Sequence, residues 1–116
     1  MKHHKAKRTL GRKKNQYNGL MSSLARNLIR DEKIVTTEAK AKELRPYIEK
    51  LLTKARVNSV ETRRLIDSRI KSKDMTKKLV DKIAPNYKDR NGGYTRITKL
   101  PLRGDDAAKM AHIEFV

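Results

Sequence analysis

The sequence predicts an α+β fold in which about four helices pack on a small three-stranded sheet, with an extended basic N-terminal arm. Two patterns predict the folded part: apolar residues recur at helical spacing in four segments, and short runs rich in β-branched residues flank them. A third observation predicts the arm, because the first 16 residues carry many charges and almost no large apolar side chain. A chain of 116 residues has room for one domain.

The arm covers residues 1–16, in which Leu10 is the only large aliphatic residue after Met1. Such a segment buries too little apolar surface to offset the entropy lost on ordering, so we expect it to be disordered when alone in solution. The predicted division is therefore a basic extended arm at 1–16 and a single globular domain at 17–116.

The first predicted helix begins near Asn18 and ends between Asp31 and Lys33. Its apolar stripe repeats at intervals of three and four residues, as one face of a helix does. The stripe consists of Leu20, Met21, Leu24, Leu28 and Ile29. The next run, residues 33–37, is rich in β-branched side chains and predicts a short strand.

The second helix is predicted over residues 38–55, with Thr36 or Thr37 as its N-cap. Its inward-facing residues are Leu44, Ile48, Leu51, Leu52 and Ala55. A proline inside a helix removes one backbone hydrogen bond and clashes with the preceding turn. We therefore expect a kink or a break at Arg45–Pro46, but not loss of the helix, because the apolar stripe continues in phase.

Two more helices are predicted in the middle of the chain. Residues 58–61, Asn-Ser-Val-Glu, resemble a capping box that opens the third helix. Asp74 is expected to cap the fourth helix and Pro85 to end it. The residues expected to face inward are Val60, Leu65, Ile66 and Ile70 in the third helix, and Met75, Leu79, Val80 and Ile83 in the fourth.

The C-terminal quarter of the chain predicts a β-hairpin. Gly92-Gly93 is the strongest turn signal in the chain, and residues 94–100, rich in Thr and Ile, follow it as a predicted strand. Residues 111–115 alternate apolar and polar side chains, as a half-buried strand does. The two strands are expected to pair around a turn at Arg103-Gly104.

Positive charge is concentrated at the N-terminus. The chain has 30 Lys and Arg against 13 Asp and Glu, a net charge of +17, and residues 1–30 hold nine of those basic residues and no acid. This distribution favours a polyanionic partner. No run approaches the roughly 18 apolar residues of a membrane span, and aromatic residues are too few for a helix lying on a bilayer. Nucleic acid is therefore the favoured partner, and a membrane is not expected.

The segment Arg90-Asn91-Gly92-Gly93-Tyr94-Thr95-Arg96 is the strongest candidate for a binding loop in the folded part. Its glycines permit close backbone approach, its guanidinium groups can bind phosphates bidentately, and its tyrosine can stack on a base or hydrogen-bond. We predict a loop that contacts RNA, although a glycine turn leading into a strand also explains the pattern. Arg63 and Arg64, at a helix start, are a weaker candidate of the same kind.

No pattern in the sequence predicts catalysis or a cofactor. The chain has no cysteine, which excludes a disulfide framework and a thiolate zinc site. His3-His4 lies among lysines without further metal ligands, and turn chemistry explains Asp105-Asp106. We expect a protein that is not an enzyme, that holds no metal or cofactor, and that binds no small-molecule substrate.

Several motifs, in this order along the chain, resemble those of one family. They are the Lys- and His-rich start with Leu10-Gly11-Arg12, Arg26-Asn27-Leu28, IVTTEAKAKELR at 34–45, Arg63-Arg64, RNGGYTRITKL at 90–100, RGDDAA at 103–108 and the final IEFV. The chain resembles the bacterial-type ribosomal large-subunit protein L-seventeen family from end to end. The blocks at 34–45 and 90–100 are the most specific.

The resemblance implies a structural constituent of the ribosome that binds and stabilises large-subunit ribosomal RNA (rRNA) and so supports translation. Its implied partners are that RNA and neighbouring large-subunit proteins, among them the small protein L-thirty-two; a homo-oligomer is not expected. The implied location is the large subunit of a cytoplasmic ribosome, with an organellar ribosome left open. The alternative reading of the charge is a DNA-binding architectural or regulatory protein.

The candidate RNA-binding residues come from the arm, the first helix, the third helix and the C-terminal loops. They are Lys2, Lys5, Lys7, Arg8, Arg12, Lys13, Lys14, Arg26, Arg63, Arg64, Arg90, Tyr94, Arg96 and Arg103. Contacts from the arm are expected to go to the phosphate backbone, because a low-complexity segment carries no geometry for reading bases.

Overall fold

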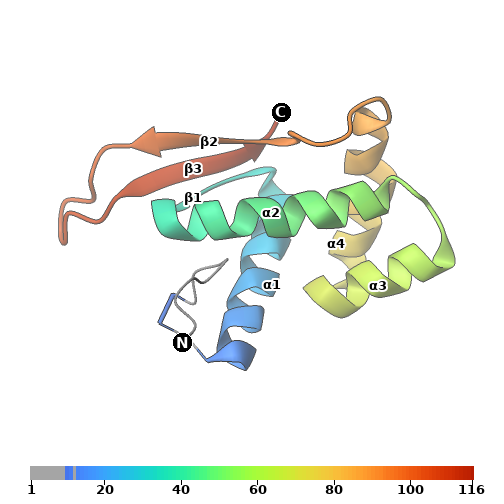
Figure 1. The fold of residues 1–116 in the computed structure, drawn as a ribbon, viewed down its shortest axis with the longest axis horizontal. Coiled ribbons are helices and arrows are strands. Elements are labelled where there is room, and N and C mark those ends of the chain that lie inside the picture. Colours follow the sequence, from blue (N-terminus) through green and yellow to red (C-terminus); the bar gives the residue numbers. More distant parts are fainter. Residues whose placement is uncertain (1–9, 12) are drawn as a thin grey trace, which may run out of the picture.

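The computed structural model describes residues 10–11 and 13–116. It shows helices on one face of an antiparallel sheet (Figure 1), which confirms the predicted α+β class. The elements in chain order are α1 (Lys14–Asp31), β1 (Lys33–Thr37), α2 (Glu38–Ala55), α3 (Val60–Ile70), α4 (Lys73–Lys78), the π-helical turn η1 (Leu79–Ile83), the 3-10 turn η2 (Ala84–Tyr87), β2 (Thr95–Leu100) and β3 (Met110–Phe115).

The sheet has the strand order β1-β3-β2, with both pairings antiparallel. The predicted hairpin between the last two strands is therefore confirmed, and β3 also pairs with β1. The register aligns Ile34, Ile113 and Ile97 in one row across the three strands. These three side chains belong to the core or pack against it, so this row belongs to the face that the helices cover.

Helix α2 lies directly against the sheet and also contacts α1 and α3 (Figure 1). Its bounds agree with the prediction, and the Thr37 side chain caps it by accepting a hydrogen bond from the backbone N–H of Lys40 at 3.3 Å. The helix is retained at Pro46, as predicted, and α2 runs through this residue without the break that the prediction allowed. Pro46 lies on the exposed side of the helix, where water can satisfy the carbonyl that proline leaves without a donor.

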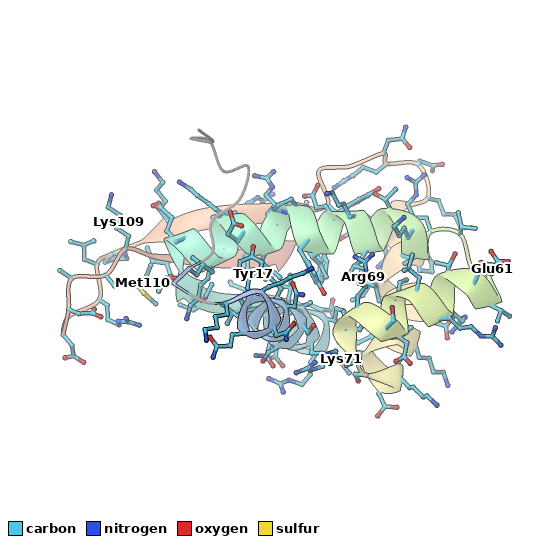
Figure 2. All side chains as sticks on the ribbon, turned by 60° about the horizontal axis from the view of Figure 1, so that its bottom comes forward. Tyr17, Glu61, Arg69, Lys71, Lys109 and Met110 are labelled. Carbon is cyan, nitrogen blue, oxygen red and sulfur yellow. The ribbon has the colours of Figure 1, made fainter. Side chains whose placement is uncertain are left out.

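Helix α1 begins at Lys14, four residues before the predicted start and inside the predicted arm. The reason is Tyr17, which is 8% exposed and donates a hydrogen bond of 2.6 Å to Glu43 Oε1 on α2. Figure 2 shows Tyr17 between the two helices. This long-range contact shifts the buried stripe of α1 to Tyr17, Met21, Ser22, Ala25, Leu28 and Ile29. Leu20 and Leu24 are only partly buried.

Helix α3 begins within the predicted segment 58–61, but its N-cap is Ser59, whose side chain accepts from the N–H of Thr62 at 3.1 Å. The third residue after this cap is Thr62 and not Glu61, so the capping box predicted over 58–61 does not describe the helix start. Ile66 and Ile70 are buried, as predicted, but Val60 is 63% exposed. The prediction for Val60 is wrong because this first turn extends beyond α2, as the end of α3 in Figure 1 shows.

The fourth helix differs from the prediction at both ends. Ser72, two residues before Asp74, is the N-cap and accepts from the N–H of Met75 at 3.3 Å. Pro85 does not end the helical path, because it fits the first turn of the 3-10 segment η2, where a proline loses no needed donor. The predicted apolar residues Leu79, Val80 and Ile83 are buried, in the π-helical turn η1.

The contact between Tyr17 and Glu43 makes a testable contribution to stability. Burial, together with the hydrogen bond to Glu43, raises the pKa of Tyr17 to about 12, so the phenol stays protonated and donating through the neutral range. We expect Tyr17→Phe to lower the free energy of unfolding by about 1–3 kcal/mol, because a buried carboxylate loses a donor. Urea denaturation monitored by circular dichroism measures the change.

A matched control is Tyr47→Phe. Tyr47 donates a hydrogen bond to the Arg69 carbonyl at 3.2 Å in an exposed setting, where water can replace it. We expect this change to cost about 0.5 kcal/mol or less, since exposed hydrogen bonds contribute little net stability. Equal losses in the two variants would contradict the assigned role of Tyr17.

Candidate nucleic-acid interface

The predicted RNA-binding residues of the arm fall mainly outside the described residues. Lys2, Lys5, Lys7, Arg8 and Arg12 lie there. Lys13 and Lys14 are described: they are exposed, and they occupy the N-cap and the first position of α1.

Tyr94 belongs to the core and does not present its ring to a base. The residue is 0% exposed and meets Tyr87 edge-to-face, with ring centroids 5.3 Å apart and an interplanar angle of 67°. Its hydroxyl donates to the Arg90 carbonyl at 3.2 Å, which closes the turn that contains the two glycines. The predicted stacking role is therefore wrong, because a ring with no exposed area cannot reach a nucleotide.

Two side chains of α2, Glu49 and Thr53, and its C-cap residue Arg56 hold this turn in place. Glu49 accepts hydrogen bonds from the Gly93 N–H at 3.3 Å and from the Thr95 hydroxyl at 2.7 Å. Thr53 Oγ1 lies 3.0 Å from the Tyr94 hydroxyl. Arg56 donates to the Tyr94 hydroxyl at 3.2 Å, to Asn91 Oδ1 at 3.2 Å and to the Lys88 carbonyl at 2.8 Å.

Sequence reasoning missed Glu49, Thr53 and Arg56. They lie three or four residues apart on α2, which puts them on one face, but that spacing gives no sign of a partner some forty residues later. Gly92 and Gly93 adopt φ values of 142° and 64°, so the turn needs glycine whatever it binds. The segment around residues 88–95 is thus a rigid turn docked on α2.

The two arginines that flank the turn differ in the contacts that their guanidinium groups make within the protein. Arg90 donates to the Gly93 carbonyl at 3.2 Å, and its guanidinium carbon lies 5.5 Å from the centroid of the Tyr87 ring. Arg96 points out from β2 with 64% of its side chain exposed, and its nearest carboxylate oxygen, on Glu114, is 3.9 Å away. Arg96 is therefore exposed but within ion-pair distance of a carboxylate, whereas Arg90 is held by a carbonyl and a ring and has no ion pair with another described residue.

The predicted arginines of the helices also differ in how far they are engaged within the protein. Arg63 forms an ion pair with Asp81 and donates to Asn58 Oδ1 at 3.0 Å, whereas Arg64 is exposed and has no ion pair with any described residue. Arg26 donates to the Ile70 carbonyl at 2.7 Å, so it satisfies a carbonyl at the C-terminal end of α3.

Arg103 is engaged within the hairpin loop. Its guanidinium donates two hydrogen bonds to Asp106, at 3.0 and 2.8 Å. These bonds, with the N–H of Ala108, lower the pKa of Asp106 to about 2, so the carboxylate stays charged at neutral pH. The loop is therefore closed by its own side chains, which is the turn role predicted for the acidic pair at 105–106.

Among residues 10–11 and 13–116, no group of three His, Asp or Glu side chains is placed to hold a metal ion. In that same part of the chain, no helix is both long and apolar enough to cross a bilayer.

A small α+β domain with a large cationic excess, whose arginines either brace the fold or project outward, is typical of structural nucleic-acid-binding proteins. The family model described as Ribosomal protein L17 matches residues 20–116. The large ribosomal subunit protein bL17 of Campylobacter concisus is 47% identical over 116 residues, which cover 100% of this chain and 98% of that protein. The protein of the same name from Sphingopyxis alaskensis is also 47% identical over 116 residues, which cover 84% of its length.

The chain therefore belongs to the ribosomal protein L17 family. Membership confirms the resemblance stated from the motifs, and it confirms a structural protein instead of an enzyme. The comparisons give no support to the DNA-binding alternative.

The role of Arg56 in holding the turn can be tested directly. We expect Arg56→Gln to speed amide hydrogen exchange in residues 88–94 and to lower the free energy of unfolding by about 1 kcal/mol, because one part-buried and two exposed acceptors lose their guanidinium donor. Arg56→Lys should rescue little, since a single ammonium group cannot span all three acceptors. The matched control is Lys54→Gln on the exposed side of α2. Unchanged exchange in the Arg56 variant would contradict the assignment.

Proposed function

We propose that this chain is a structural constituent of the large subunit of the bacterial cytoplasmic ribosome, where it binds and stabilises large-subunit rRNA. The observation that carries this function is 47% identity over the whole chain to relatives named large ribosomal subunit protein bL17. The net charge of +17 supports it, because neutralising the phosphate backbone is the main electrostatic task of a protein packed in RNA.

The proposed contact with RNA has two parts. The predicted arm, residues 1–16, supplies closely spaced cations in residues 1–12 and at Lys13 and Lys14, and these neutralise phosphates without reading bases. The folded domain supplies Arg64, which is exposed and has no ion pair with another described residue, and Arg96, whose side chain is 64% exposed. The arm contributes affinity, and the domain fixes the orientation of the bound protein.

We also propose that the small ribosomal protein L-thirty-two is a direct neighbour, as the family resemblance implies. The hairpin supports a protein contact near its tip, where Leu102 is 60% exposed. The register puts Leu100 opposite Met110 at the same end of the sheet, and both are partly exposed. Exposed apolar side chains gathered at one end of a sheet are typical of a surface that another protein covers.

Removal of residues 1–12 tests the role of the arm while leaving α1 intact. The deletion removes five basic side chains, and each phosphate contact contributes about 0.7 to 0.9 to the slope of log K against log salt concentration. We expect the slope for binding to a large-subunit rRNA transcript to become shallower, by at most about 3.5 to 4.5. Filter binding at several salt concentrations measures it.

The control for this deletion is a full-length chain in which the same five residues are replaced by Gln. If the arm acts through charge, this variant should match the deletion; a salt slope equal to that of the unaltered chain would contradict the role of the arm. The proposed function itself is tested by sedimentation of a cell lysate. The unaltered chain should migrate with the large subunit at moderately high salt, and migration with free protein would contradict the function.

Arg96→Ala tests the contribution of the folded domain. We expect it to weaken rRNA binding by roughly 10-fold or more, the size of a well-placed charged contact of about 1.5–3 kcal/mol. The matched control is Lys50→Ala, which removes one exposed charge from α2 instead of from the sheet. Equal effects in the two variants would show that Arg96 acts only through net charge.

A further inference from the structure

A groove between α3 and α4 brings two lysines that were not predicted to bind RNA, Lys73 and Lys77, next to the predicted Arg63 and Arg64. It has a volume of about 290 Å³. Its lining comes from both helices and consists of Val60, Arg63, Arg64, Asp67, Lys73, Thr76 and Lys77. Four of these seven side chains are basic and one is acidic.

The lining residues occupy one face of each helix. On α3 they are spaced by three, four and seven residues, and on α4 by three and four, which is the spacing of side chains that project in the same direction. Lys71 adopts the left-handed conformation with φ 58° at the end of α3, and Ser72 then caps α4. This tight connection turns the chain so that the two basic faces border one groove.

The charge of the groove is only partly balanced from within the protein. Arg63 is paired with Asp81 on η1. Arg64, Lys73 and Lys77 are exposed, and none of them forms an ion pair with another described residue. Lys73 and Lys77 are also one helical turn apart, where two like charges repel each other. A bound anion would remove this repulsion, whereas water only screens it.

The apolar residue in the lining of the groove restricts which kind of anion can bind there. Val60 is 63% exposed at the edge of the groove, although a valine at a helix start gains nothing from contact with water. Thr76 is buried, and its hydroxyl donates to the Ser72 carbonyl at 2.8 Å, so it is not available to a ligand. A ligand that fits must present separated negative charges together with apolar surface between them.

We propose that this groove binds the sugar–phosphate backbone of one strand of large-subunit rRNA, an inference that rests on the proposed function. Phosphates pair with Arg64, Lys73 and Lys77, and the intervening riboses pack against Val60. The groove recognises backbone and not sequence, because its uncommitted polar groups, apart from Asp67, are cations. The helices that border the groove, α3 and α4, lie at the opposite end of the molecule from the hairpin tip (Figure 1), and Figure 2 shows the same separation between Glu61 on α3 and Lys109.

The test is the double variant Lys73→Gln/Lys77→Gln. Loss of two phosphate contacts should make the salt slope for rRNA binding shallower by about 1.4 to 1.8 and weaken binding in 0.1 M salt by roughly 10-fold or more. The matched control is Lys50→Gln/Lys54→Gln, which removes two exposed lysines with the same spacing from α2. The charge-preserving Lys73→Arg/Lys77→Arg should bind as the unaltered chain does, and circular dichroism verifies that all three variants are folded.

A second measurement locates the RNA. Because the chain has no cysteine, Val60→Cys provides a single attachment point for a hydroxyl-radical probe, and Val35→Cys on β1 provides a control. Probes at the two positions should cleave different rRNA segments, and at protein concentrations that saturate the rRNA the Lys73→Gln/Lys77→Gln change should weaken the cleavage from Val60 more than that from Val35. Absence of cleavage from Val60 would overturn the proposal.

The remaining outcomes separate this proposal from the function on which it rests. Equal losses in the α4 and α2 double variants would overturn the groove as a site and leave rRNA binding in place. Normal binding to naked rRNA together with weaker association with the large subunit would mean that a protein covers the groove, which also overturns the proposal. Failure of the unaltered chain to bind rRNA would overturn the proposed function itself.

Discussion

The structure depends on the burial of α2 between the sheet and the other helices. One side of this helix is completely covered, with Ala41, Leu44, Ile48 and Leu52 all 0% exposed. Burying an aliphatic side chain of this size contributes roughly 1.5–3 kcal/mol, so α2 anchors the helical layer and the sheet to each other. Because α2 is held in place, its polar side chains can position other segments. Glu43 positions the start of α1, and the C-cap residue Arg56 positions the turn that leads into β2.

The basic residues of the domain have two roles: some stabilise the fold through internal hydrogen bonds, and others are exposed to solvent. Arg26, Arg56 and Arg103 donate to backbone carbonyls or to carboxylates and hydroxyls within the protein, so they hold together a domain whose core is small. Others project into solvent without a close partner. Net charge alone therefore does not give the number of guanidinium groups that can reach RNA, because some of them are already engaged in hydrogen bonds inside the fold. The separation also explains how so basic a chain can fold at all: its internal ion pairs and carbonyl contacts offset some of the mutual repulsion.

Periodicity in the sequence was enough to predict the elements that depend on local pattern. The bounds of β1 and α2 and the C-terminal hairpin all agree with the structure. The errors occur where a contact between residues far apart in the sequence determines the structure. Helix α1 starts earlier than predicted because the Tyr17 hydroxyl donates a hydrogen bond to Glu43. Tyr94 is buried because its hydroxyl forms hydrogen bonds with Thr53 and Arg56. Similarly, the motif at 90–96 identified the family, but its side chains could not be divided into core and surface without the fold.

The order of the strands has a consequence for how the chain folds as it is made. Both β1 and β2 pair only with β3, which is the last of the three to be synthesised. The apolar residues of β1 thus leave the synthesising ribosome long before a partner strand exists, while α1, α2 and α3 can already pack on one another. Pairing between segments so far apart in sequence is slow and leaves strand edges open in the interval. Protection of the nascent β1 edge is then a requirement that arises from topology alone.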